Sequence, residues 1–174
     1  HSFLARVKRE ILNKKNGEPA RIIIKVNSLT DGELIEALYE ASAAGIEIDL
    51  IVRGICSLRP GVKGLSEHIR VRSIVGRFLE HSRIFYFANG GQDEVYIGSA
   101  DWMNRNLDRR VEVVIPVIEE SFKEYLRNDV LEAYLKDNVN ARVLRPDGTY
   151  RKVTSGGSGQ VDAQMSFVGE DLAF

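Results

Sequence analysis

Two short runs of β-branched residues flank an amphipathic segment, and this pattern constrains the fold most. Residues 21–26 (RIIIKV) and 46–52 (IEIDLIV) lack helical periodicity and have the composition of buried strands. Between them, residues 28–31 offer N-cap side chains, apolar residues recur at helical spacing, and Gly45 ends the segment. A strand, a helix and a strand with short connections predict a βαβ unit with parallel strands and a right-handed crossover. The sequence therefore predicts an α/β fold.

The remaining elements follow from the same signals. We expect helices over residues 3–13 and 119–135, and strands over 69–75, 83–88, 94–98 and 110–117. Asn89-Gly90-Gly91 predicts a hairpin between the strands on either side of it. Residues 141–153 are expected to form a second hairpin that turns at Pro146-Asp147-Gly148.

Domain organisation and cell compartment follow from length and composition. A chain of 174 residues with 44% apolar residues is most simply one domain, which we place at residues 1–153. Residues 154–160 (TSGGSGQ) are typical of a flexible linker, so 154–174 is expected to be linker and tail. Cys56 is the single cysteine and no apolar run reaches the roughly 20 residues of a membrane span. We therefore expect a cytoplasmic protein.

The net charge of −1 conceals a basic middle segment. From residue 53 to residue 110 there are ten basic residues, nine of them arginine, and six acidic ones, a net of +4. Arginine presents a planar fork of donors that matches phosphate oxygens. The segment therefore indicates a local anion site, whereas a nucleic-acid-binding surface would require a basic stripe and a high isoelectric point.

A long loop and one histidine are the candidates for chemistry. Residues 53–66 (RGICSLRPGVKGLS) follow the carboxyl end of a predicted parallel strand, where open α/β sheets place their ligands. His81 lies between Arg77 and Arg83, just before a strand, and these arginines favour a nearby anion. Such an anion would raise the tendency of the histidine to carry a proton. A purely structural histidine remains the alternative at this position.

Several site classes are excluded by motif. One cysteine and three scattered histidines have none of the zinc spacings, so no metal site is predicted in this chain. The sequence holds neither a P-loop nor a Gly-x-Ser-x-Gly elbow. The polar run 101–108 lacks the EF-hand glycine and closing glutamate.

Long stretches of the chain are similar to a known family. The runs 25–29 (KVNSL), 48–91 (IDLIVRGICSLRPGVKGLSEHIRVRSIVGRFLEHSRIFYFANGG) and 95–117 (VYIGSADWMNRNLDRRVEVVIPV) resemble the C-terminal region of polyphosphate kinase. Within them lies a degenerate phospholipase D pattern, a His-x-Lys followed by a Gly-Ser turn, which reads His81-Ser82-Arg83 and Gly98-Ser99. The resemblance implies a phospholipase D-like mixed sheet flanked by helices.

The resemblance also implies a function. Polyphosphate kinase reversibly transfers the terminal phosphate of ATP to polyphosphate through a phosphohistidine. In the family, that histidine lies in a preceding related domain, together with the arginines that bind magnesium. The chain then corresponds to one half of the site and is expected to be inactive in isolation. Implied partners are ATP, ADP, polyphosphate and the rest of the kinase chain, with Mg²⁺ ligands outside these residues. The full-length enzyme is expected to be a homo-oligomer without nucleic-acid binding, and its association with membranes is left open.

The family's phosphate and nucleotide contacts fall on Arg53 and His81, with Arg110 as a further arginine of the same tunnel. The predicted strand ends agree, because Arg53 ends one strand, His81 precedes another and Arg110 begins a third. These side chains are expected to converge at one edge of the sheet, with His81 as the catalytic residue. Further arginines are candidate phosphate ligands or partners of Asp101, Asp108 and Glu80, namely Arg59, Arg83, Arg105 and Arg109.

Two other functions fit the same residues. A phospholipase D-type phosphodiesterase or nuclease would use His81 as a nucleophile in a homodimer, although Arg83 replaces the lysine of that pattern. A non-catalytic polyanion-binding or assembly module would use the arginines for binding alone.

Overall fold

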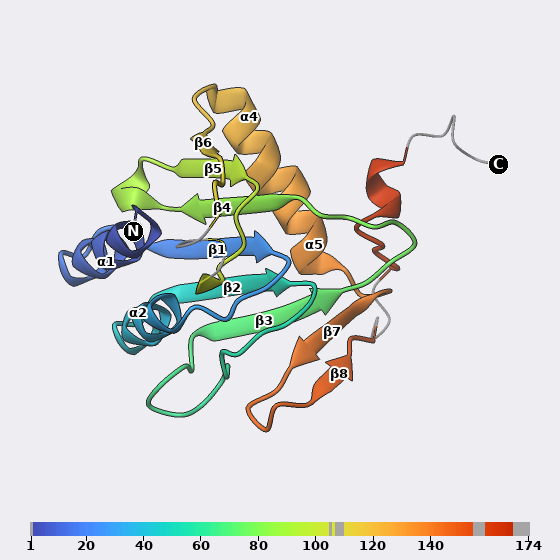
Figure 1. Ribbon diagram of the computed structural model, residues 1–174, viewed down its shortest axis with the longest axis horizontal. Helices are drawn as coiled ribbons and strands as arrows, with labels where there is room; N and C mark the ends of the chain where they lie inside the picture. Colours follow the sequence, from blue (N-terminus) through green and yellow to red (C-terminus); the bar gives the residue numbers. More distant parts are fainter. Residues whose placement is uncertain (1, 105, 107–109, 155–158, 169–174) are drawn as a thin grey trace.

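One mixed sheet organises the molecule, and its strands follow the order β6-β5-β4-β1-β2-β3-β7-β8 (Figure 1). The computed structural model describes residues 2–104, 106, 110–154 and 159–168. The strands are β1 (Arg21–Val26), β2 (Glu47–Val52), β3 (Ile69–Ile74), β4 (Arg83–Phe87), β5 (Glu94–Gly98), β6 (Val114–Pro116), β7 (Ala141–Leu144) and β8 (Tyr150–Lys152). Strands β1, β2 and β3 are parallel, whereas β4 to β8 join antiparallel neighbours. The predicted α/β class with a mixed sheet is confirmed.

The predicted βαβ unit is present with its expected caps. Strands β1 and β2 pair in parallel, with Ile24 opposite Leu50. Helix α2 (Gly32–Ala43) begins after Asp31, whose side chain accepts a hydrogen bond from the Leu34 amide at 3.0 Å. The chain leaves the helix through Gly45, which has a φ of 84°, a backbone conformation that glycine adopts without steric penalty.

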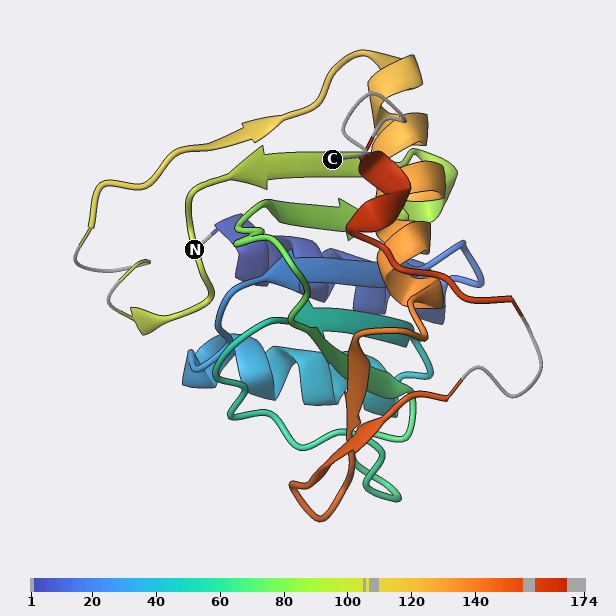
Figure 2. The same cartoon turned by 90° about the vertical axis from the view of Figure 1, so that its right-hand side faces the viewer.

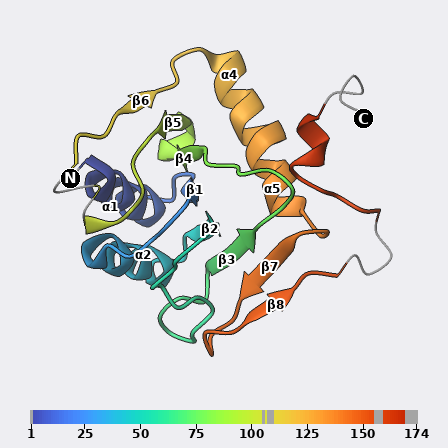
Figure 3. The same ribbon diagram turned by 45° about the vertical axis from the view of Figure 1, so that its right-hand side comes forward.

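Helices cover both faces of the sheet (Figure 3). Helix α1 (Ser2–Lys15) and α2 lie on one face, where Ile22 and Ile24 join their apolar cluster. The other face is covered by the segment α4 (Glu120–Glu124), a π-helical stretch Tyr125–Leu131 and α5 (Glu132–Lys136), and there Ile23 packs near Leu131. Because alternate residues of β1 enter opposite clusters, the strand is apolar almost throughout.

The structure differs from the sequence prediction at the edge strand. We predicted a strand over 110–117, but β6 spans only Val114–Pro116. Its partner β5 ends at Gly98, which pairs with Val114, so residues before Val113 extend past the end of the neighbouring strand. The helix predicted over 119–135 is also interrupted, because its middle turns are π-helical. The hairpin predicted over 141–153 forms from β7 and β8.

The C-terminal segment packs on the sheet domain. Ala163 is fully buried, and its amide donates a hydrogen bond to Asp137 at 2.8 Å. The ring of Phe167 stacks on that of Tyr134, with centroids 6.5 Å apart. The domain boundary at residue 153 stays a prediction, but residues 161–168 contact the domain extensively, whereas we expected a flexible tail. Within the described ranges, none of the helices has the length and apolar character needed to cross a bilayer.

Candidate functional site

The candidate site is a cluster of polar side chains that includes Arg53, His81 and Arg83. It lies where the strand order of the sheet changes direction. From β1 the chain proceeds to β2 and β3 on one side, and β4 then joins β1 from the other side. The carboxyl ends of β1 and β2 therefore lie beside the start of β4. These strand ends are on the right-hand side of the sheet in Figure 1. Such switch points leave a crevice that binds ligands in open α/β sheets.

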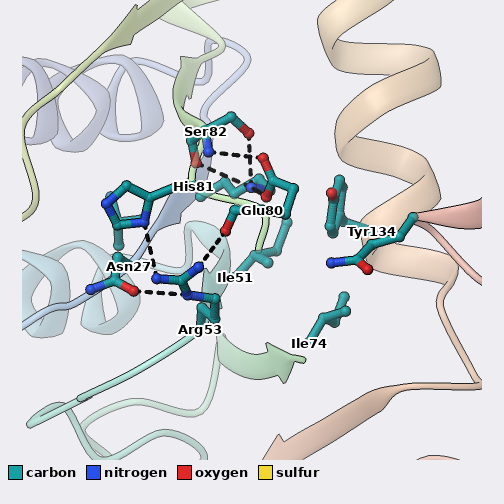
Figure 4. Close-up of a pocket in the computed structure, with 11 residues that line it drawn as sticks. Asn27, Ile51, Arg53, Ile74, Glu80, His81, Ser82 and Tyr134 are labelled. Carbon is teal, nitrogen blue, oxygen red and sulfur yellow. Dashed lines mark hydrogen bonds and ion pairs between the residues drawn. The ribbon is translucent and has the colours of Figure 1, made fainter. Parts of the chain in front are cut away.

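Arg53 follows β2 and is held by three neighbours (Figure 4). Its Nε donates to Asn27 Oδ1 at 2.9 Å, and Nη1 donates to the Glu80 carbonyl at 2.7 Å. Its Nη2 lies 3.0 Å from His81 Nδ1. The side chain is thus fixed in orientation, and one end of the guanidinium group faces the imidazole ring.

Arg83, the first residue of β4, approaches the same ring from the other side. Its Nη2 lies 2.8 Å from His81 Nε2. Two of its nitrogens also donate to the carboxylate of Asp101, at 3.2 and 3.1 Å. Burial raises the pKa of Asp101, but hydrogen bonds from Arg83 and from two backbone amides outweigh this effect and lower the pKa below its ordinary value.

His81 therefore lies between two guanidinium groups. A neutral imidazole accepts a hydrogen bond at one nitrogen only, and a guanidinium group only donates. One of the two arginines consequently faces a ring N–H without an acceptor, whichever tautomer forms. Partial desolvation, followed by the charges of Arg83 and Arg53, lowers the pKa of His81. The cluster therefore has more hydrogen-bond donors than acceptors around the ring, and an anion is the kind of group that would supply the missing acceptor.

A buried lysine supports the loop that carries His81. Lys25 forms an ion pair with Glu80, and its Nζ donates to Ser82 Oγ at 2.9 Å and to the Ser82 carbonyl at 3.1 Å. The ammonium group also lies 4.6 Å from the ring centroid of Tyr134. Burial lowers the pKa of Lys25, while the bonds from Lys25 and Ser82 overcome burial and lower that of Glu80.

The C-terminal segment holds the same loop at a second position. Gln164 Oε1 accepts from the Phe78 amide at 2.8 Å, and its Nε2 donates to the Phe78 carbonyl at 2.9 Å. A Cβ atom on Gly76 would lie 2.4 Å from Gln164 Oε1, so only glycine leaves space for this clamp. Gln164 lines the pocket together with Arg53 and His81.

The structure brings together part of the predicted site. Arg53, His81 and Arg83 converge as expected, and Arg83 pairs with Asp101, one of the acidic partners we considered. Arg110 does not begin a strand, because pairing starts at Val114. It is exposed and lies outside the residues that line the pocket. The catalytic and binding roles assigned to these residues stay predictions.

The other candidate arginines have different positions. Arg59 is exposed within the loop over residues 53–66, where its amide donates to the Tyr39 hydroxyl at 2.9 Å, and it does not line the pocket. Arg105 and Arg109 lie outside the described residues.

Sequence reasoning missed Lys25, Asn27 and Ser82 as members of the cluster. Lys25 carried a usable signal, because a single charge inside the apolar run RIIIKV must be buried and therefore paired. Asn27 and Ser82 carried none, since polar residues next to the ends of strands are common.

The donor set does not fit a magnesium ion. Mg²⁺ prefers carboxylate oxygens and waters, but the carboxylates of Glu80 and Asp101 are both engaged by cations. In the described part of the chain, no group of three or more histidine, cysteine or acidic side chains is arranged to hold a metal ion. Any magnesium needed for nucleotide binding would depend on ligands outside this cluster.

The fold is phospholipase D-like. A phospholipase D family member, Nuc from Salmonella typhimurium, superposes with a TM-score of 0.54 over 78% of this chain and 88% of its own, at 16% identity, a likeness of fold alone. Residues 1–164 match the family model of polyphosphate kinase C-terminal domain 2, and the chain belongs to this family.

Individual relatives support the same assignment. A polyphosphate kinase of Thermosynechococcus vestitus is 60% identical over 83% of this chain and 20% of its own length. One from Pseudomonas aeruginosa is 52% identical over 90% of this chain and 23% of its own. The crystal structure of polyphosphate kinase from Porphyromonas gingivalis superposes with a TM-score of 0.89 at 42% identity, over 93% of this chain and 25% of the other. The chain thus spans about a fifth to a quarter of these relatives.

Proposed function

We propose that this chain supplies the phosphate- and nucleotide-binding half of a polyphosphate kinase active site. In this proposal Arg53 and Arg83 bind phosphoryl oxygens, and His81 acts on the transferring group. The phosphohistidine belongs to a part of the longer protein outside this chain. Family membership supports the enzyme class, and the arrangement of His81 between two guanidinium groups is the observation that carries the local assignment.

The charge of the cluster supports an anionic ligand. Three cations, Lys25, Arg53 and Arg83, face two carboxylates, so the cluster has a net charge of +1 with a neutral His81. The lysine is satisfied by Glu80 and Ser82. The arginines keep donors directed at a ring that can accept from only one of them. A phosphoryl group has several oxygens and would accept from both.

The chemistry follows from these positions. The bond between the γ-phosphorus of ATP and its bridging oxygen breaks as a P–N bond forms on the acceptor histidine, and ADP leaves. The P–N bond then breaks as a terminal oxygen of polyphosphate attacks phosphorus. Phosphoryl transfer requires positioning and positive charge around the equatorial oxygens, which Arg53 and Arg83 would supply. The charges of the two arginines lower the pKa of His81, and the negative charge of a bound phosphate would oppose this effect. The ring could then carry a proton and stabilise or protonate the leaving oxygen.

Magnesium would offset the charge of the phosphates, with ligands elsewhere in the longer protein. The roles proposed for Arg53, Arg83 and His81 do not require any of these residues to bind a metal ion.

The first test measures binding to the chain itself. Arg53→Ala should weaken pyrophosphate binding, measured by titration calorimetry, because one of the converging donor groups is lost. Lys14→Ala is the control, because Lys14 is an exposed cation in the last turn of α1. Equal loss from both variants would indicate diffuse charge without a site.

The second test addresses His81 in the longer enzyme. His81→Gln keeps hydrogen-bonding capacity but supplies neither a proton nor a positive charge, so turnover should fall by roughly 10²–10⁴-fold. His68→Ala should behave as the parent, because His68 is paired with Glu47. Parental turnover of His81→Gln at matched thermal stability would remove the catalytic role.

A third test separates the alternatives. The chain alone should gain no acid-labile phosphate from ATP and magnesium and should not cleave a phosphodiester. Cleavage that depends on His81 would instead establish the phosphodiesterase function suggested by the shared fold.

A further inference from the structure

Residues 161–168, which we call the strap, pack on the same face of the sheet as the candidate site. Ala163 belongs to the apolar cluster of that face together with Ile51 and Ile74, and these two isoleucines also line the pocket. Figure 2 shows the last turn of the strap, Met165–Phe167 (red), beside the helix that contains α5 (orange). The strap therefore reaches the site from a part of the sequence about 80 residues after His81.

The strap is anchored at points away from the pocket. Asp137 is fully buried, and its Oδ2 accepts from the Ala163 amide at 2.8 Å while its Oδ1 accepts from three further backbone amides. Asp162 Oδ1 accepts from the amides of Gln164 and Met165 at 3.1 and 3.2 Å. These bonds fix the backbone on both sides of Gln164 without contacting the loop that carries His81.

A first connection runs from the strap to the imidazole ring through hydrogen bonds. The side-chain amide of Gln164 bonds to both the amide and the carbonyl of Phe78. The same carbonyl accepts from the Glu80 amide at 3.0 Å, and the Glu80 carbonyl accepts from Arg53 Nη1. Arg53 Nη2 in turn faces His81 Nδ1. The position of Gln164 is therefore linked to the position of the arginine and the ring.

A second connection runs through aromatic contacts. The ring of Phe167 stacks on that of Tyr134 at an interplanar angle of 21°. The Tyr134 ring also lies against the ammonium group of Lys25, which donates to the hydroxyl and the carbonyl of Ser82. The strap thus contacts the loop at Phe78 and supports the residues that hold it near His81.

The loop depends on such contacts for its order. Residues 75–82 form neither a helix nor most of a strand, and the side chains of Phe78 and Leu79 are exposed. Burial of apolar surface therefore contributes little to holding this segment, and fixing its backbone has an entropic cost. Polar contacts from Lys25 and Gln164 must offset much of that cost.

We propose that Gln164 is a positioning residue of the anion site, and that docking of the strap is coupled to binding of a phosphoryl group there. This inference rests on the proposed function. Gln164 acts through the backbone of Phe78 and leaves contact with the anion to Arg53, His81 and Arg83, because both ends of its amide are bonded to Phe78. Coupling between two equilibria is reciprocal, so a bound anion should also stabilise the docked strap.

The first experiment measures pyrophosphate binding to the 174-residue chain by titration calorimetry. Gln164→Leu retains an apolar stem of similar size but forms neither bond to Phe78, so affinity should fall by roughly three- to tenfold. Gln160→Leu is the control, because Gln160 is exposed and precedes the strap, and it should bind as the parent does. The fluorescence of the buried Trp102 verifies that each variant is folded at the temperature of the measurement.

A matched pair of variants at Asp162 tests the strap without touching the loop. Asp162→Ala removes the acceptor for the Gln164 and Met165 amides, whereas Asp162→Asn retains an oxygen for them. Both variants remove one negative charge, which by itself would favour an anion. Asp162→Ala should nevertheless bind pyrophosphate more weakly than the parent, and Asp162→Asn should not.

The pKa of His81 gives a readout that a merely structural role of Gln164 would not change. Partial desolvation and the charges of Arg83 and Arg53 lower this pKa in the parent. In folded Gln164→Leu the ring is held less closely to these groups, so the pKa should rise, as followed by NMR titration. An unchanged pKa would show that Gln164 does not position the ring.

Hydrogen exchange tests the reciprocal effect. Saturating pyrophosphate should slow exchange at the Ala163 amide, which bonds to Asp137 and does not line the pocket. Exchange at the Thr149 amide, in the exposed β7–β8 turn, should stay as it is. Arg53→Ala should abolish the effect at Ala163, because the anion is then bound weakly.

Two results would overturn the inference. They are parental pyrophosphate affinity in both Gln164→Leu and Asp162→Ala, and an Ala163 amide whose exchange does not respond to pyrophosphate in the parent. If Arg53→Ala weakens binding while the strap variants do not, only this inference fails. If Arg53→Ala leaves the affinity unchanged, the proposed function fails and this inference fails with it.

Discussion

Replacing Asp101 by Asn removes the charge that faces Arg83 while keeping the shape of the side chain. The carboxylate is 5% exposed and the arginine side chain 12% exposed, so the pair is largely shielded from water. Loss of one partner from a buried ion pair costs about 3–5 kcal/mol because the other charge stays buried. Asn keeps one oxygen that can accept from the backbone amides of Asn27 and Ser28, which both donate to Asp101 Oδ1 in the parent. We therefore expect a loss of about 3 kcal/mol in the free energy of unfolding.

Trp102 offers the assay. It is the single tryptophan, fully buried beside Phe3 and Phe85, so its fluorescence reports global unfolding in urea. A loss of about 3 kcal/mol should also lower the Tm by about 6–12 °C in a chain of this length. Asp147→Asn is the control, because Asp147 is fully exposed in the β7–β8 turn.

The pH dependence gives a second check on the same residue. The pKa of Asp101 is lower in the folded protein than its ordinary value near 3.9. Its stabilising contribution is therefore complete above the unfolded pKa and is lost as the pH falls through the folded pKa. The difference between the parent and Asp101→Asn should shrink over that acidic range. A variant as stable as the Asp147→Asn control at neutral pH would refute the reasoning.

The remaining predictions concern the loop that carries His81. Lys25→Met should raise the pKa of Glu80, followed by NMR titration, and should destabilise the fold by about 2 kcal/mol because a partly buried carboxylate loses its partner. An unchanged pKa of Glu80 in this variant would contradict the ion pair between Lys25 and Glu80. Gln164→Ala should increase hydrogen exchange at the Phe78 amide, whereas equal exchange in parent and variant would show that the clamp has no effect. Inorganic phosphate should raise the pKa of His81, and a fall would exclude a proton donor at this position.

Local sequence patterns determined most of the fold. The run over residues 21–26 became β1 with the predicted bounds, because a β-branched stretch that is apolar on both faces is stable only between two layers. Asp31 and Gly45 set the limits of α2 through capping and a positive φ, which are properties of single residues. These signals act over a few residues, so they can be read without the tertiary structure.

Long-range contacts decided the rest. The length of β6 depends on where β5 ends, and no residue within 110–117 encodes the position of Gly98. The π-helical turns and the packing of residues 161–168 likewise depend on partners far away in the sequence.

The candidate site shows the same division. The sequence by itself determined that arginines and His81 follow strand ends, because residue type and strand position are local properties, and the family resemblance pointed to the same residues. Only the tertiary structure decided which arginines reach the ring, since Arg83 enters through antiparallel pairing of β4 with β1 while Arg110 remains exposed beyond the end of β5. It also brought Lys25 and Gln164, which lie 56 and 83 residues from His81, into contact with the loop that carries it. Strand order and sheet register bring such residues together, and neither follows from residue type or local spacing.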